Sequence, residues 1–129
     1  MQHLWSVWNA SRQTLVADNV RLAATSRERC QGLLGMKSLA RGHGLWIRPC
    51  SSIHTFGMSF AIDVVYLDRR QRVRKVVRRV SAWRISCCFV AHSVIELPAG
   101  LIEETGTRRG DQLRVTCKRH RRYQTKDTV

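Results

Sequence analysis

The stretch from Phe60 to Val80 limits most strongly what this chain can fold into. Residues Phe60–Leu67 (FAIDVVYL) form a long, mostly apolar run, and the polar connection Asp68–Gln71 (DRRQ) follows it. A second run, Val73–Val80 (VRKVVRRV), then returns with four valines. Two such runs around a short polar connection predict a β-hairpin, because β-branched residues favour strands.

The second run of this hairpin also fits a helix. Its four valines recur at helical spacing, and a basic amphipathic helix would favour binding to a membrane or to nucleic acid. The density of valine and the turn that precedes it favour a strand. We therefore interpret Val73–Val80 as the returning strand.

Short apolar runs elsewhere in the chain predict further strands. The Asp18-Asn19 pair suits a tight turn, so we expect a short strand on each side of it, the second over Val20–Ala24. The remaining expected strands are GLWIRP stopped by Pro49, HSVIELPAG ended by Pro98 and Gly100, and a final strand after the Gly110-Asp111 turn. The segment LIEETG allows at most one helical turn, closed by Gly106.

One short helix is predicted near the N-terminal third of the chain, over residues 26–34. Thr25 and Glu28 have the spacing of a capping box, and Gly35 stands where a left-handed helix terminator belongs. Gly32 lies inside this helix at a cost of about 1 kcal/mol relative to alanine. Its presence indicates that another group approaches the backbone closely there.

The length and composition suit one small domain. The chain has 129 residues, of which 43% are hydrophobic and 25% charged, and that is enough for a core without metal or disulfide staples. Many short strands with one helix predict a mostly β fold, at the margin of the α+β class, arranged as a small barrel or sandwich. We expect the domain to span residues 1–117 and the basic residues 118–129 to form a flexible tail.

No apolar run approaches the length of a membrane span, and the N-terminus lacks the pattern of a secretory signal. We therefore expect a cytoplasmic protein. An odd number of cysteines without an export signal argues against a disulfide framework. We interpret the cysteines as small buried hydrophobes; they are Cys30, Cys50, Cys87, Cys88 and Cys117.

The net charge of +14 is the unusual quantity in the composition. Such a field attracts nucleic acid or another polyanion. Arginine outnumbers lysine 19 to 4, however, and a high-GC genome produces that ratio without selection for binding. The candidate polyanion-binding residues are clustered in the hairpin and are Arg69, Arg70, Arg72, Arg74, Lys75, Arg78 and Arg79.

Five segments, taken in order, carry a family resemblance: RCQGLLG, IHTFGMSFAIDVVYLD, AWR, VIELPAG and GTRRGDQL. Their combination resembles the DUF 192 family, a domain of unknown function, from about Thr14 to Val115. Leu34 replaces a frequent methionine, and Ala61 and Ala82 replace frequent prolines. The resemblance implies a compact, mostly β domain and brings no established reaction, cofactor or catalytic residue.

His54 and Asp63 are the first candidates for chemistry. His54 would act as a base, with Asp63 fixing its tautomer, in a hydrolase-type enzyme. A histidine at a strand entrance also serves to satisfy backbone groups, and no nucleophile stands at a recognisable spacing. If the Asp63 carboxylate is buried, it requires an arginine or a backbone partner, and Arg84 and Arg29 are the candidate arginines.

The spacing of cysteine and histidine bears on metal binding. Cys50 and His54 are separated as C-x3-H, and Cys87-Cys88 with His92 form a similar group. Two such half-motifs would supply four zinc ligands, but adjacent cysteines rarely reach one metal. We therefore predict no metal site.

The leading hypothesis is a non-enzymatic module that binds a small ligand or a partner protein near the IHTFGM segment. Glu96 alternates with Ile95 and Leu97, so it either lines a pocket or faces solvent. The candidate pocket residues are His54, Thr55, Met58, Asp63, Trp83, Arg84 and Glu96. Polyanion binding through the hairpin and tail, and hydrolysis by His54 with Asp63, are the alternatives.

Overall fold

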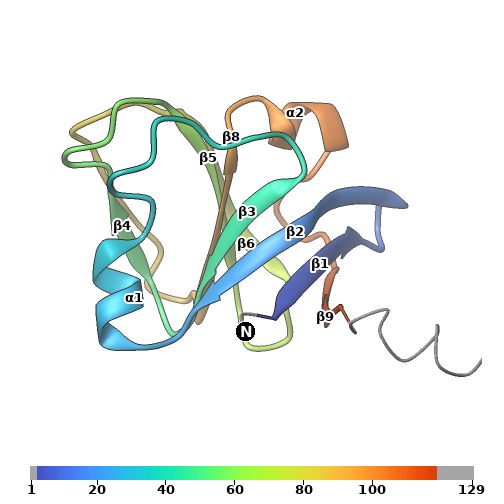
Figure 1. Cartoon of the computed structure of the whole chain (residues 1–129). Coiled ribbons are helices and arrows are strands. Elements are labelled where there is room, and N and C mark those ends of the chain that lie inside the picture. The colour runs from blue at the N-terminus through green and yellow to red at the C-terminus, as the bar shows by residue number, and fades with distance from the viewer. Residues whose placement is uncertain (1–2, 119–129) are drawn as a thin grey trace, which may run out of the picture.

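The fold is built from short strands arranged in two sheets, together with two short helices (Figure 1). The computed structural model describes residues 3–118. Within them the elements are β1 (Leu4–Asn9), β2 (Thr14–Ala23), α1 (Ser26–Gln31), β3 (His43–Ile47), β4 (Ser52–His54), β5 (Ile62–Leu67), β6 (Val73–Val80), β7 (Ile85–Cys87), β8 (Ser93–Pro98), α2 (Leu101–Thr105) and β9 (Leu113–Cys117). The predicted mostly β fold is confirmed.

Seven strands form one curled sheet in the order β6-β5-β8-β3-β2-β1-β9. All neighbours are antiparallel except β2 and β3, which run parallel. The two ends of the sheet approach each other where Arg72 forms an isolated bridge with Gln112 and the Val73 N–H donates to the Asp111 carbonyl at 2.8 Å. The sheet is therefore a half-barrel.

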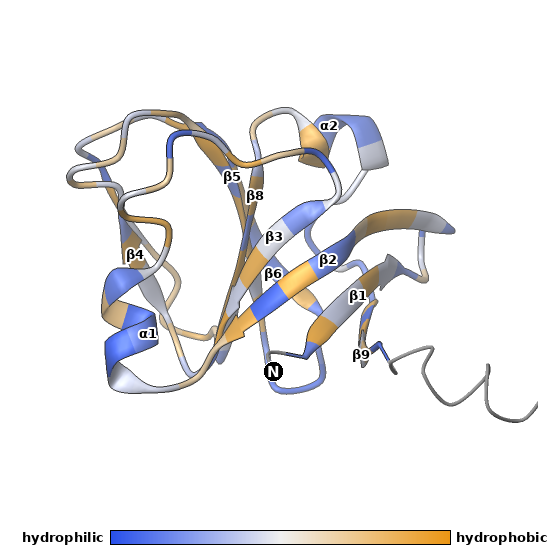
Figure 2. Cartoon of the chain, in the orientation of Figure 1, coloured by the Kyte–Doolittle hydropathy of each residue, from blue (hydrophilic) through white to orange (hydrophobic). Residues whose placement is uncertain are grey.

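The central strands are buried on both faces, because a separate hydrophobic cluster covers each face. Trp46, Ile95 and Leu97 belong to the cluster that also contains residues of α2. Leu45 and Val64 point the other way, into the cluster beneath β4 and the turn after α1. Figure 2 shows the hydrophobic residues gathered on the strands, while α1 is largely hydrophilic.

The Phe60–Val80 hairpin is confirmed: β5 and β6 pair antiparallel, with Val64 opposite Val77. The interpretation of Val73–Val80 as a strand is therefore correct, and the helical alternative is wrong. The capping box is confirmed too, since the Thr25 side chain accepts from the Glu28 N–H and the Glu28 side chain accepts from the Thr25 N–H.

The predicted turn at Asp18-Asn19 is wrong, because β2 runs straight through these residues. Both of their N–H groups donate to the Gly42 carbonyl, at 3.1 and 2.9 Å, where β2 begins to pair with β3. The chain reverses earlier, before Thr14. There the Asn9 side chain accepts from the Arg12 N–H at 3.0 Å, which stabilises the turn.

The predicted end of the first helix is also wrong. Helix α1 ends at Gln31, and Gly32, rather than Gly35, follows it with φ 50°. The Gly32 N–H donates to the Glu28 carbonyl at 2.9 Å. Gly32 therefore ends the helix instead of lying inside it.

Two strands, β4 and β7, are not predicted by the sequence pattern. β4 and β7 form a separate antiparallel pair, with Ile53 opposite Ser86. They are only three residues long, too short for an alternation pattern to predict. Neither helix in the described part of the chain has the length and apolar character that crossing a membrane requires.

Candidate functional site

Asp63 and Glu96 lie on opposite faces of the curled sheet. In the pairing of β5 with β8, Val64 stands opposite Glu96 and Asp63 stands opposite Leu97. Directly opposed residues share a face, so Glu96 points to the face beneath β4, and Asp63 points to the face beneath α2. The candidate pocket residues named from the sequence therefore do not form one site.

Asp63 is fully buried and is held by backbone donors. Its carboxylate accepts from the N–H groups of Arg79 (2.9 Å), Gly100 (3.1 Å) and Ile102 (2.9 Å). The expected backbone partner is thus present. Neither of the candidate arginines, Arg84 and Arg29, has a hydrogen bond or ion pair with Asp63 among the described residues.

Thr55 holds the loop that follows β6. Its hydroxyl donates to the Ser81 carbonyl at 2.6 Å and accepts from the Arg84 N–H at 2.9 Å. Its carbonyl accepts from the Trp83 N–H at 3.1 Å. Trp83 and Arg84 are exposed, and Met58 is buried in the hydrophobic cluster beneath β4. Of these four residues, Thr55 thus supports the loop, Trp83 and Arg84 lie at the surface, and Met58 belongs to the core.

His54 and Glu96 line one cavity, which we call the Glu96 pocket. It has a volume of ≈ 450 Å³ and lies between α1, the end of β3, β4 and β8. Its lining residues are Ser26, Arg29, Cys30, Gln31, Gly32, Leu34, Ile47, Pro49, Cys50, Ser52, Ile53, His54 and Glu96. Gly32 lies beside Glu96, but a Cβ there would make only ordinary contact with Glu96 Oε1 at 3.8 Å, so the positive φ of 50° at the end of α1 is what favours glycine.

Glu96 is the most perturbed group in this pocket. Its side chain is 3% exposed, and burial raises the pKa of its carboxyl to about 7. Among the described residues no hydrogen bond or ion pair offsets that burial. The carboxyl therefore changes its protonation state near neutral pH, whereas an ordinary glutamate is ionised there.

Three other side chains of the pocket carry N–H or S–H groups. His54 Nδ1 accepts from the Phe56 N–H at 3.2 Å, so the neutral ring carries its proton on Nε2. Arg29 donates to the Ala24 carbonyl at 2.8 Å and lies half-buried at the rim. Cys50 donates to the Ser52 carbonyl at 3.0 Å.

This arrangement does not supply an activated nucleophile. Burial and the nearby Glu96 raise the pKa of the Cys50 thiol, so Cys50 is held as a thiol. No hydrogen bond joins His54 to Asp63 in residues 3–118, and the three backbone donors occupy the Asp63 carboxylate. The His54–Asp63 pair required by the hydrolase hypothesis is therefore not formed in this part of the chain.

The described residues contain no group of three or more His, Cys, Asp or Glu side chains that could hold a metal ion. All five cysteines are free. The interpretation of the cysteines as buried residues is wrong, because Cys30 and Cys117 are exposed and the other three are half-buried. They lie outside the two hydrophobic clusters or at their margins.

The basic residues of the hairpin separate onto different surfaces. Arg69 and Arg70 line a depression with residues 89–92, whereas Lys75, Arg78 and Arg79 line a groove beside β7. The other two are engaged in structural contacts: Arg72 donates to the Gly110 carbonyl at 2.9 Å, and Arg74 lies 3.5 Å from the Asp68 carboxylate. The predicted C-terminal tail lies outside the described residues except for Lys118.

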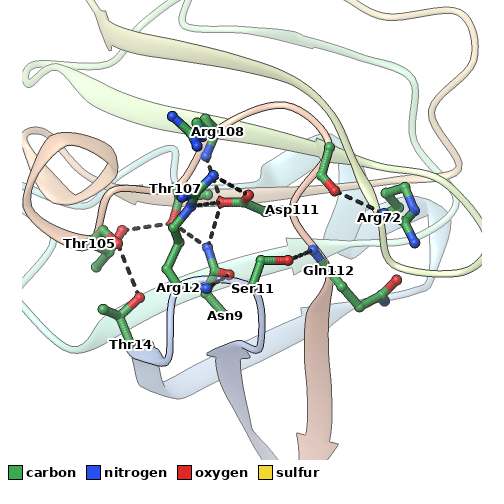
Figure 3. A network of polar contacts seen from close by, with 11 residues as sticks. Asn9, Ser11, Arg12, Thr14, Arg72, Thr105, Thr107, Arg108, Asp111 and Gln112 are labelled. Atoms are coloured by element: carbon green, nitrogen blue, oxygen red, sulfur yellow. Dashed lines mark hydrogen bonds and ion pairs between the residues drawn. The ribbon is translucent and has the colours of Figure 1, made fainter.

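A second polar cluster connects the β1–β2 turn to the start of β9 (Figure 3). The Asp111 carboxylate accepts from Asn9 Nδ2 at 3.0 Å, from Arg12 Nε at 3.2 Å and from the Arg108 N–H at 3.0 Å. Thr107 accepts from the same Asn9 amide at 3.2 Å. The Asp111 carboxylate and the Asn9 amide are thus paired within the cluster, which stabilises the fold.

The sequence as a whole matches a known family. A family model, DUF192, described as an uncharacterized ACR, covers residues 7–115. This chain belongs to the DUF192 family. The resemblance seen in the sequence is therefore confirmed. A comparison with curated proteins gives no match.

Two solved structures share the fold of this DUF192 chain. One, described as a candidate transcription regulator from Sinorhizobium meliloti 1021, has a TM-score of 0.77 and 20% identity over 89% of this chain and 94% of that one. The other, a protein of unknown function from Novosphingobium aromaticivorans DSM 12444, has a TM-score of 0.74 and 19% identity over 85% of this chain and 82% of that one. Such low identities establish the fold alone.

Proposed function

We propose that this DUF192 chain is a non-enzymatic binding module that takes a small ligand in the Glu96 pocket. The observation that carries the proposal is the Glu96 carboxyl, which is 3% exposed and faces the cavity without a protein partner in the described residues. A buried carboxyl without a partner is costly, and a ligand with N–H or O–H groups would supply the missing donors.

The lining of the pocket defines the chemistry of the ligand. Glu96 accepts hydrogen bonds when ionised, and His54 offers its Nε2 proton near the rim. Leu34, Ile47 and Ile53 supply apolar walls. The volume of ≈ 450 Å³ is in the range of small-ligand sites. These features fit a small molecule with a primary amine or hydroxyl at one end and an apolar body.

Native mass spectrometry of the freshly purified protein tests this proposal. We expect an excess mass in the native state that is lost on denaturation. Glu96→Gln, which removes the ionisable group, reduces that mass, while Glu103→Gln, at an exposed position of α2, leaves it unchanged. An excess mass that Glu96→Gln retains in full contradicts the proposed site.

A direct titration covers a ligand that dissociates during purification. Ethanolamine, benzylamine and tyramine are added to isotopically labelled protein at about 10 mM, the upper range of weak small-ligand affinity. We expect amide shifts confined to the lining of the Glu96 pocket, and weaker binding by Glu96→Gln. Absence of shifts with all three probes, together with no native excess mass, overturns the proposal.

A further inference from the structure

A cationic groove lies between the outer edge of β6 and the segment that carries β7. Its charged lining consists of Lys75, Arg78, Arg79 and Arg84, with no acidic side chain among its described lining residues. The groove has a volume of ≈ 480 Å³. Lys75 Nζ donates to the Cys87 carbonyl at 2.8 Å and so connects the two walls. None of these four cations has an ion pair with a carboxylate in residues 3–118, so they produce a local positive field, to which Arg79 contributes from beside Gly100.

An exposed aromatic pair adjoins this groove. The rings of Phe56 and Trp83 stack with centroids 5.7 Å apart and planes inclined by 26°. Their side chains are 41% and 68% exposed. Trp83 directly precedes Arg84, which lines the groove, and the N–H groups of both residues donate to Thr55, so one loop carries the exposed indole and one of the cations.

The loop holds Trp83 in an unfavourable backbone conformation. Its φ is 64°, a value uncommon for a bulky residue. Hydrogen bonds from the Trp83 and Arg84 N–H groups to Thr55 fix the loop in this state. Burial of the indole does not explain the strain, because most of the side chain is exposed. Strain of this kind is characteristic of functional sites.

We propose that the cationic groove and the Phe56–Trp83 pair bind single-stranded nucleic acid. Arginine and lysine neutralise successive phosphates, and exposed aromatic rings stack on unpaired bases. A duplex does not present base faces to such a pair, and an acidic peptide needs the cations but not the stacked rings. The groove shares no lining residue with the Glu96 pocket, but the aromatic pair adjoins that pocket, because Phe56 packs against His54 of its lining with ring centroids 5.1 Å apart.

Fluorescence anisotropy with a labelled oligothymidylate of about twelve nucleotides tests this inference. We expect binding whose affinity falls with salt, with a slope of about −0.7 per phosphate neutralised. Arg78→Ala combined with Arg84→Ala weakens binding by about tenfold or more, because two phosphate contacts are lost. Arg69→Ala combined with Arg70→Ala is the matched control, with the same change in charge on another surface, and changes affinity by less than about twofold. Equal losses in the two double variants, or no binding at low salt, overturn the proposal.

The aromatic pair separates nucleic acid from other polyanions. Trp83→Ala weakens oligothymidylate binding at least about fivefold and abolishes the quenching of tryptophan fluorescence by the bases. Phe89→Ala removes an aromatic ring that is 88% exposed on another loop and leaves both signals unchanged. Polyglutamate and a duplex of equal length serve as competitors. Tighter binding of either competitor than of the single strand, or no effect of Trp83→Ala, overturns the proposal.

Discussion

The Asp63 carboxylate accepts a hydrogen bond at 2.9 Å from the backbone N–H of Ile102, a residue 39 positions further along the chain. The same carboxylate accepts from the N–H groups of Gly100 and Arg79. One buried side chain therefore connects β5 to β6 and to the first turn of α2. Asp63 lies in a segment that carries the resemblance to DUF 192, and these bonds give it an architectural role.

Asp63→Asn is expected to lower the free energy of unfolding by about 1–3 kcal/mol. All three partners of Asp63 are donors, so the amide group of asparagine must face at least one N–H and leave it unsatisfied. Urea denaturation at neutral pH measures the change. Glu103→Gln, at an exposed position of α2, controls for the loss of one negative charge. Equal stability of the two variants would contradict the architectural role.

The hairpin and the capping box were predictable because their signals are local. The valine-rich runs around Asp68–Gln71, and the spacing of Thr25 and Glu28, each define an element without tertiary contacts. The continuous strand through Asp18 and Asn19 was not predictable, because the pairing of β2 with β3 overrides the turn preference of these two residues. Strands as short as β4 and β7 leave no periodic pattern at all.

The candidate site was only partly predictable for a related reason. Alternation along β8 correctly separates Glu96 from Ile95 and Leu97, but it does not show which face is hollow. Gly32 lies in the lining of the pocket, but the close approach that its presence predicted is absent among the described residues, because its nearest neighbours stand at ordinary contact distance.

Glu96 is expected to make stability fall as the pH rises. Its pKa is raised to about 7 in the folded protein from an ordinary value of 4.5. Between these values the unfolded chain releases the proton while the folded protein retains it, so ionisation favours unfolding. The penalty is absent below pH 4.5, grows through this window and is fully developed above pH 7, where it amounts to about 3 kcal/mol.

Urea denaturation of the wild-type protein and Glu96→Gln at a series of pH values isolates this contribution. Glutamine does not ionise, so the stability of the variant relative to the wild-type protein rises across the window. Other carboxyls cancel in the difference between the two proteins, including Asp68, whose pKa is lowered against the effect of its burial by the N–H groups of Arg72 and Arg70. A difference that is independent of pH would contradict the raised pKa.

Asp111 is expected to show the opposite dependence. Its burial opposes ionisation, but hydrogen bonds from Asn9, Arg12 and the Arg108 N–H outweigh that effect and lower its pKa. A lowered pKa stabilises the folded state above the ordinary value near 3.8, and this contribution is lost as the pH falls through the folded value. Asp111→Asn therefore costs about 1–3 kcal/mol at neutral pH and less in acid. Thermal unfolding of both proteins at neutral and acidic pH measures the two differences, and a cost that stays constant would contradict this account.

Gly44 is expected to be intolerant of a side chain although it lies in a regular strand. A Cβ at this position would lie 3.1 Å from the Glu96 carbonyl oxygen and 3.2 Å from Leu97 Cδ2, both closer than ordinary contact. Gly44→Ala therefore forces β3 and β8 apart, and we expect it to lower the free energy of unfolding by about 1–3 kcal/mol, measured by urea denaturation. Leu97→Val removes the Leu97 Cδ2 methyl group but leaves the Glu96 carbonyl oxygen in place. The cost of Gly44→Ala in the Leu97→Val background should thus be smaller yet still positive, and an undiminished cost would show that the Leu97 side chain yields without strain.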